Sequence, residues 1–148
     1  MADKPIIATV RETKESPMSV EVDVDGHKIE ADEPVSSGGK NLGPYPHEIL
    51  VAALGACTSM TLRLYADRKK LPLRRTEVRL KHDKIHATDC AECETREGMI
   101  DRIERVITLE GDLDPAQRAR LIEIADKCPV HRTLKSEVDI RTTEQPPG

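Results

Sequence analysis

Apolar and polar residues alternate along the first part of the chain as expected of β-strands. Residues 6–10 are mostly apolar, valines alternate with acidic residues at 20–24, and an Asp-Gly pair at 25–26 precedes a third segment at 27–31. Alternation places every second side chain on one face of a strand, and Asp-Gly is typical of a two-residue hairpin turn. The pattern predicts an antiparallel meander, followed at 33–46 by a loop of turn-forming residues.

The apolar positions between 47 and 70 instead recur at steps of three and four residues, as on one face of an α-helix. Arg63 and Arg68 lie in the last turns, where cations suit the helix dipole, and Pro72 ends the pattern. Because the N-terminal half of this helix is uncharged, we expect it to be central and buried nearly all round.

The second half of the chain predicts a long hairpin followed by two helices. Asp114 and Pro115 are favoured at a helix start, and Pro129 breaks that helix beside Cys128. The expected elements are strands at 76–86 and 103–109 around a polar loop at 87–98, helices at 115–127 and 129–134, and a short strand at 138–140. Together they predict one α+β domain, 1–148, with strands around a buried helix and a frayed tail from about 142.

Composition narrows the classes of function. The chain has 148 residues, 37% hydrophobic and 34% charged, which is typical of a single soluble domain. A net charge of −4 and only two aromatic residues, both tyrosines, disfavour nucleic-acid binding. The longest uncharged run, 49–62, is shorter than the roughly 18 residues of a membrane helix, and the first residues lack an apolar stretch. These features predict a cytoplasmic protein without a membrane span.

Two of the four cysteines lie at helical positions. Cys57 sits in the most apolar helix among small residues, a setting that suits either a core thiol or a reactive thiol in a narrow pocket. Cys128 is expected at a helix start, where backbone N–H groups stabilise a thiolate, with His131 and Arg132 adding positive potential. It could equally be a neutral capping residue, or a resolving thiol if Cys57 lies nearby.

The other two cysteines, Cys90 and Cys93, follow His82 and His86 in the pattern His-x3-His-x3-Cys-x2-Cys. Two histidines four apart on a strand face the same side, and a turn can return two thiolates, so these four residues could bind structural zinc. The same cysteines could form a dithiol or disulfide switch, or lie unused in a solvated loop.

Two charged residues precede the apolar helix pattern. Arg11 is the one arginine among the first 62 residues, and Glu48 lies just before the apolar run. Each has an ordinary interpretation: Arg11 as a solvated charge at the end of a strand, and Glu48 as a first-turn acidic residue that interacts favourably with the helix dipole. Together they are also the groups that a buried thiol needs, one to favour the thiolate and one to hold the arginine.

The segment 43–57, which reads GPYPHEILVAALGAC, and the later Cys-Pro-Val-His at 128–131 resemble the OsmC/Ohr family of osmotically inducible and organic hydroperoxide resistance proteins. The similarity in order and spacing covers nearly the whole chain. It is greatest with the branch also found fused to α/β-hydrolase domains, whose DCAxCE and ADKCPVHRTL motifs match 89–94 and 125–134.

The resemblance implies an OsmC-like fold in an intertwined homodimer, with active sites at the subunit interface. It implies a cysteine peroxidase that requires no cofactor. Cys57 would attack an organic hydroperoxide, Cys128 would resolve the sulfenic acid, and a lipoyl-type dithiol would reduce the disulfide. Arg11 and Glu48 would polarise thiol and peroxide, although typical peroxidases place the glutamate where this chain has His47.

The leading interpretation is therefore a thiol-dependent peroxidase that reduces organic hydroperoxides. The alternative is a non-enzymatic redox-sensing or zinc-binding module that uses Cys90 and Cys93. In a third interpretation, the chain is a free-standing relative of a fusion domain that serves a partner hydrolase.

Overall fold

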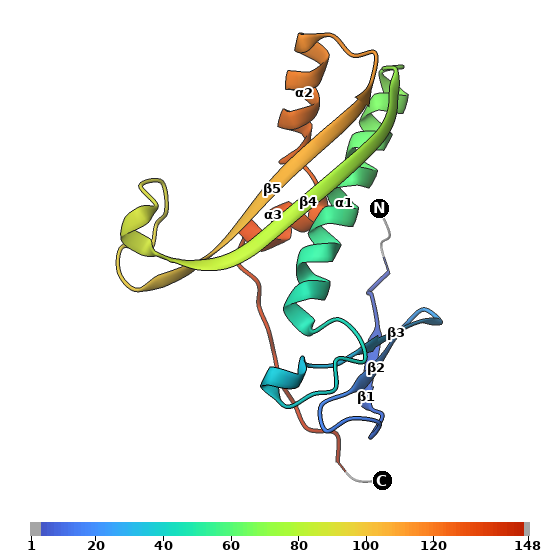
Figure 1. The fold of residues 1–148 in the computed structure, drawn as a ribbon, viewed down its shortest axis with the longest axis vertical. Helices are drawn as coiled ribbons and strands as arrows, with labels where there is room; N and C mark the ends of the chain where they lie inside the picture. The colour runs from blue at the N-terminus through green and yellow to red at the C-terminus, as the bar shows by residue number, and fades with distance from the viewer. Residues whose placement is uncertain (1–3, 147–148) are drawn as a thin grey trace. The chain divides into compact units, whose positions relative to one another are not determined.

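The computed structural model of the protein describes residues 4–146. Two compact units are present, one within residues 1–50 and one within residues 51–148, and each is described by itself. Five strands, three α-helices and two short 3-10 helices make up the described chain (Figure 1). The prediction of a single domain stays a prediction.

The first unit contains the predicted meander. Strands β1 (Ala8–Glu12), β2 (Val20–Val24) and β3 (His27–Ala31) form an antiparallel sheet in that order. Asp25 and Gly26 both have positive φ, 54° and 82°, as the turn between β2 and β3 requires. The hairpin prediction is confirmed, with β1 beginning two residues later than the sequence pattern suggested.

The loop after β3 is ordered by one buried carboxylate. Asp32, 2% exposed, accepts hydrogen bonds from the backbone N–H groups of Glu33 (2.8 Å), Lys40 (3.0 Å) and Leu42 (3.3 Å), and from the Ser16 hydroxyl (3.0 Å). A carboxylate that accepts several N–H bonds is stabilised in its charged form. Asp32 therefore holds both ends of the loop, which includes a 3-10 turn at Val35–Ser37.

Asp32 gives a stability prediction with a defined sign. Burial raises the pKa of its carboxyl, but the hydrogen bonds from Lys40, Leu42, Glu33 and Ser16 outweigh burial and hold that pKa below its usual 3.8. Because the folded pKa is lowered, the stabilisation is present above the usual value and is lost as pH falls through the folded pKa. Asp32→Asn should lower the Tm by several degrees at pH 7, and by less near pH 3.

Thermal unfolding of both proteins at the two pH values measures this difference. Asp25→Asn, at the exposed hairpin turn, is the matched control and should change the Tm little, since asparagine also accepts positive φ. If Asp32→Asn lowers the Tm equally at both pH values, the negative charge of Asp32 is not what holds the loop.

The second unit is a long hairpin packed against helices. Strands β4 (Leu73–His86) and β5 (Met99–Gly111) pair antiparallel. Figure 1 shows them alongside α1 (Pro46–Arg68), α2 (Pro115–Ala125) and α3 (Pro129–Lys135). The aliphatic core joins these elements and consists of Leu62, Ala66, Leu73, Leu109, Leu113, Leu121, Ile124 and Ala125. The predicted hairpin and all three helices are confirmed.

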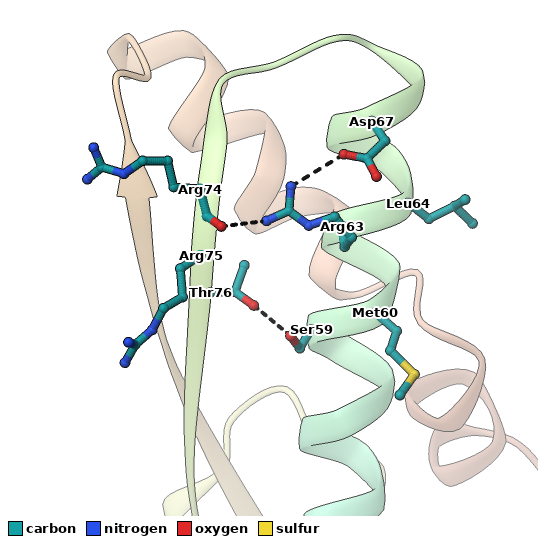
Figure 2. A pocket seen from close by; sticks show the side chains of 8 residues that line it. All are labelled: Ser59, Met60, Arg63, Leu64, Asp67, Arg74, Arg75 and Thr76. Carbon is teal, nitrogen blue, oxygen red and sulfur yellow. Dashed lines mark hydrogen bonds and ion pairs between the residues drawn. The ribbon is translucent and has the colours of Figure 1, made fainter.

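Side chains of α1 attach it to β4. Arg63 donates to the carbonyl oxygens of Leu73 (2.8 Å) and Arg74 (2.9 Å), and the hydroxyls of Ser59 and Thr76 are hydrogen-bonded at 2.6 Å (Figure 2). These contacts fix the orientation of α1 on β4. They therefore also determine which helix residues face the strand.

Burial of α1 differs from the prediction. In the N-terminal half, for which burial was expected, Leu50 is 42% exposed and Ala53 and Ala56 are exposed as well. Further along the helix, Met60 and Leu64 are 71% and 53% exposed. The expectation that the helix is buried nearly all round is wrong for the described chain, because the hairpin and α2 cover only one stripe of it. The buried residues of that stripe are Leu54, Gly55, Thr58, Leu62 and Ala66.

The predicted strand at 138–140 is also wrong. Residues 137–146 have no regular secondary structure, and Val138 and Ile140 are 54% and 83% exposed. A strand needs a neighbour for its backbone hydrogen bonds, and no strand of the described chain pairs with this segment.

Candidate functional site

The fold brings Cys57 and Cys128 together. Cys57 lies on α1, and Cys128 is the residue that caps the start of α3. The Cys57 sulfur accepts a hydrogen bond from the Val130 backbone N–H at 3.5 Å, and the Cys128 sulfur accepts one from the His131 N–H at 3.3 Å. The Cys128 thiol is near enough to Cys57 to raise the pKa of the Cys57 thiol. Both are free of disulfides.

The two thiols differ in exposure. Cys128 is 0% exposed, whereas Cys57 is only partly buried. A reagent from solvent can therefore reach Cys57 first, and Cys128 can react once its neighbour has changed. This is the order required of an attacking thiol and a resolving thiol.

Several neighbours set the pKa of the Cys57 thiol. Burial raises it, the Val130 N–H lowers it, the adjacent Cys128 thiol raises it again, and the Thr61 hydroxyl lowers it, with a net rise above the usual value of 9.0. Cys57 is therefore largely protonated at neutral pH in this arrangement. Because the thiolate is the nucleophile, its reactivity should increase steadily toward alkaline pH.

Opposite substitutions should move the Cys57 pKa in opposite directions. Cys128→Ala removes a neighbour that raises this pKa and should lower it, whereas Thr61→Val removes a hydroxyl that lowers it and should raise it. The rate of iodoacetamide alkylation of the Cys57 peptide, followed against pH, measures both shifts. Midpoints that move in the same direction in the two variants would contradict this account.

A guanidinium from β5 lies next to the thiols. Arg105 donates to the Thr58 hydroxyl (3.0 Å) and to the Asp126 carboxylate (2.8 Å), and lies 3.2 Å from Nδ1 of His131. The Thr58 hydroxyl donates to the Leu54 carbonyl oxygen at 2.7 Å and lies 3.9 Å from the Cys128 sulfur. Only 12% of the Arg105 side chain is exposed, so its positive charge is partly shielded from water and acts strongly on this cluster.

His131 is a neutral member of the cluster. Burial lowers the pKa of its imidazole, Arg105 and Lys135 lower it further, and Asp126 opposes them. An uncharged imidazole that accepts from Arg105 at Nδ1 carries its proton on Nε2. The cluster therefore combines one fixed cation, a hydroxyl and two thiols, a set suited to stabilising thiolate and oxyanion charge.

Comparison with known proteins identifies the family. Residues 38–143 match the family model described as OsmC-like protein. The chain belongs to this family. The match spans both compact units and includes Cys57, Cys128 and Arg105. No curated protein sequence matches the chain.

Solved structures similar to this OsmC-like protein agree in fold. The organic hydroperoxide resistance protein OsmC from Legionella pneumophila has 19% identity and a TM-score of 0.66, covering 94% of this chain and 95% of its own. An organic hydroperoxide resistance protein from Elizabethkingia anophelis has 21% identity and a TM-score of 0.66, and the match covers 90% of each chain. The organic hydroperoxide resistance protein OhrB of Bacillus subtilis has 18% identity and a TM-score of 0.62, and the match covers 93% of this chain and 96% of OhrB. At these identities the likeness confirms the predicted α+β fold with antiparallel sheets and a long helix.

Sequence reasoning missed Arg105, Thr58 and Asp126. A signal for Arg105 was present, because it occupies the same alternating positions of β5 as Ile103, Ile107 and Leu109. An arginine in an inward-facing apolar row must meet a partner, since a buried charge without one is costly. No comparable pattern marks Thr58 or Asp126.

Arg11 and Glu48 belong to the first unit of this OsmC-like protein. Arg11 is exposed on β1, opposite Glu21 of β2. Glu48 is exposed in the first turn of α1, where its carboxylate accepts from the Tyr45 backbone N–H at 2.9 Å, as a helix-start residue does. Their action on the thiols stays a prediction.

The cysteines of the predicted zinc site are bonded to each other. Cys90 and Cys93 form a disulfide, and Nε2 of His82 lies 2.9 Å from the Asp101 carboxylate. His86 ends β4. Among residues 4–146, no three histidine, cysteine or acidic side chains are grouped so as to hold a metal ion. A disulfide cannot supply thiolate ligands, so the zinc site remains a prediction for the reduced chain.

An open groove of about 560 Å³ lies between α1 and β4 (Figure 2). It contains neither free cysteine. Two of its arginines are already engaged, Arg63 with backbone carbonyls and Asp67, and Arg75 with Glu110. The groove is thus separate from the thiol cluster. Its lining residues are Ser59, Met60, Arg63, Leu64, Asp67, Arg74, Arg75 and Thr76.

Proposed function

We propose that this OsmC-like protein is a thiol-dependent peroxidase that reduces organic hydroperoxides. The observation that carries the proposal is the pairing of a partly exposed Cys57 with a fully buried Cys128, each sulfur accepting a backbone N–H. Two-electron reduction of a peroxide by a dithiol mechanism requires one thiol that the peroxide can reach and a second thiol beside it, and this pair meets both requirements. The family supports this proposal, because similar structures include organic hydroperoxide resistance proteins.

The reaction proceeds in three balanced steps. The Cys57 thiolate attacks the terminal oxygen of the hydroperoxide, the O–O bond breaks, and the alkoxide takes a proton and leaves as the alcohol. Cys57 is then a sulfenic acid, whose sulfur is attacked by the Cys128 thiolate with release of water. A dithiol returns two electrons and two protons to the resulting disulfide and leaves as its own disulfide.

The surroundings of the thiols favour the second step. Nucleophilic attack requires Cys128 as thiolate, and the His131 N–H can stabilise that charge. The Thr58 hydroxyl would add a second bond by turning its proton from the Leu54 carbonyl oxygen to the sulfur. Arg105 fixes the Thr58 hydroxyl and adds a positive charge to the cluster. Arg11 and Glu48, which the family resemblance assigns to the first step, are retained in the proposal as the groups that polarise the peroxide.

The test is to treat the reduced protein with one equivalent of cumene hydroperoxide and map its cysteines by mass spectrometry. The experiment uses a Cys90→Ser, Cys93→Ser variant, so that the only disulfide that can form within the chain is between Cys57 and Cys128. We expect a disulfide linking the Cys57 and Cys128 peptides and one equivalent of alcohol. Free thiols at both positions after the hydroperoxide is consumed, or an unconsumed hydroperoxide, would overturn the proposal.

We also propose that the working protein is a homodimer. By length and composition α1 could cross a membrane, and only 22% of its most apolar stretch is buried in the described chain. Met60 and Leu64 are exposed on α1, and the Arg63 hydrogen bond to the Leu73 carbonyl holds this helix against β4. Because large exposed apolar surfaces are typical of protein interfaces, we propose that a second copy of the chain covers them. Light scattering should give twice the chain mass, and Leu64→Glu should shift it toward the monomer. A monomeric wild-type protein would contradict this.

A further inference from the structure

The second pair of cysteines lies in the loop between β4 and β5. Cys90 and Cys93 are joined by a disulfide with their Cα atoms 5.4 Å apart, and both are only partly buried. Figure 1 shows this loop, in yellow, at the end of the hairpin and beyond the helices of its unit. The bond is therefore accessible to a thiol from solvent or from another protein.

The disulfide is not needed to hold the loop in place. The Ala87 N–H donates to the Gly98 carbonyl at 2.8 Å, and the pairing of His86 with Met99 continues the β4–β5 ladder from there. The crosslink spans only three positions in sequence, and crosslinks that close short loops constrain the unfolded chain least. This bond can therefore break and re-form without unfolding the hairpin.

The loop pair is separate from the Cys57 and Cys128 cluster. Arg105, which belongs to that cluster, lies six residues along β5 from Met99, where the loop ends. At about 3.3 Å per strand residue, the loop is roughly 20 Å away from Arg105. Cys90 and Cys93 are too distant to resolve a sulfenic acid on Cys57 within the same unit.

We propose that Cys90 and Cys93 form a second, reversible redox centre that exchanges electrons with uncharged dithiols. A thiolate of the dithiol attacks one sulfur of the bond and releases the other as a thiol. The second thiol of the reagent then attacks the mixed disulfide, releases the first cysteine, and leaves as a cyclic disulfide. Two electrons and two protons pass to the loop, and an oxidised dithiol takes them back in the reverse reaction.

Charge around the loop favours uncharged reagents. Asp89, Glu92, Glu94 and Glu97 are all exposed, and Arg96 is the one cation between Ala87 and Gly98. This net negative charge repels anionic thiols before contact, an effect that weakens as salt screens it. A neutral dithiol does not meet this barrier.

A Cys57→Ser, Cys128→Ser double variant isolates the loop pair, so the result does not depend on the proposed peroxidase. The probes are dihydrolipoamide and dihydrolipoate, which differ by one negative charge, with alkylation and mass spectrometry to count reduced thiols. We expect complete reduction with an unchanged circular dichroism spectrum, reoxidation by oxidised lipoamide, and a several-fold faster reaction with the neutral reagent at low salt only. Glu92→Gln with Glu94→Gln should narrow that difference.

Three results would overturn the inference. One is a bond that resists excess neutral dithiol until the protein is denatured, and another is reduction accompanied by loss of the folded spectrum. The third is a reduced loop that takes up one zinc ion per chain and loses it in Cys93→Ser, because the thiols would then be metal ligands. Equal rates for the two dithiols at low salt would overturn the claimed selectivity for uncharged reagents.

Discussion

Cys57→Ser should lower the rate of hydroperoxide reduction by at least about a thousandfold, because it removes the nucleophile whose sulfur forms the covalent intermediate. Serine keeps the size of the side chain and accepts the Val130 N–H that the sulfur accepts now. The fold should therefore survive, with thermal unfolding close to that of the wild type. Consumption of cumene hydroperoxide with a dithiol reductant measures the loss.

Cys128→Ser provides the comparison that separates the two thiols. This variant should consume one equivalent of hydroperoxide at the normal rate or faster, because Cys57 is intact and has lost a thiol neighbour that raises its pKa. It should then hold a long-lived sulfenic acid that dimedone traps. Turnover that persists in Cys57→Ser would remove that residue from the mechanism. Loss of the first equivalent in Cys128→Ser would show instead that the two thiols act as one unit from the start.

Local sequence patterns determined most of the fold. The Asp25-Gly26 turn and the helix after Asp114 depend on neighbours within a few positions, and both were predicted. The β4–β5 hairpin was predicted from alternation in two strands that follow each other in the chain, although it pairs residues as far apart as Leu73 and Gly111. Burial of α1 was not, because it depends on which other elements cover each side of the helix. The strand at 138–140 failed for a similar reason, since alternation alone cannot supply a pairing partner.

The candidate site required information of a different kind. No spacing rule shows that Cys57 and Cys128 meet, because their approach depends on how α1 and α3 pack. The family resemblance supplied that expectation. Arg105 was recognisable in principle as a charge in an apolar row, but its partners Thr58 and Asp126 come from elements distant in sequence and follow only from the tertiary structure.

Arg105→Met should slow resolution of the Cys57 sulfenic acid by up to about a hundredfold, the lower end of the loss expected for a donor that contacts developing charge directly, because Arg105 acts through its neighbours. The substitution removes the cation that positions the Thr58 hydroxyl beside the Cys128 sulfur. Arg105 acts through these neighbours and is a positioning residue. Arg105→Lys restores the charge without the planar fork that reaches Thr58, Asp126 and His131, and should recover only part of the rate.

Loss of stability can be distinguished from this effect. The Asp126 side chain is 69% exposed, so removing Arg105 leaves that carboxylate in water and not as a stranded buried charge. Arg118→Met is the matched control, because Arg118 is a comparable arginine that binds the carbonyl oxygens of Leu109 and Gly111. It should lower the Tm while leaving the lifetime of the sulfenic acid unchanged, measured by dimedone trapping after one equivalent of hydroperoxide. If Arg105→Met resolves its sulfenic acid as fast as Arg118→Met, the guanidinium has only a structural role, and the charge that assists Cys128 must come from elsewhere.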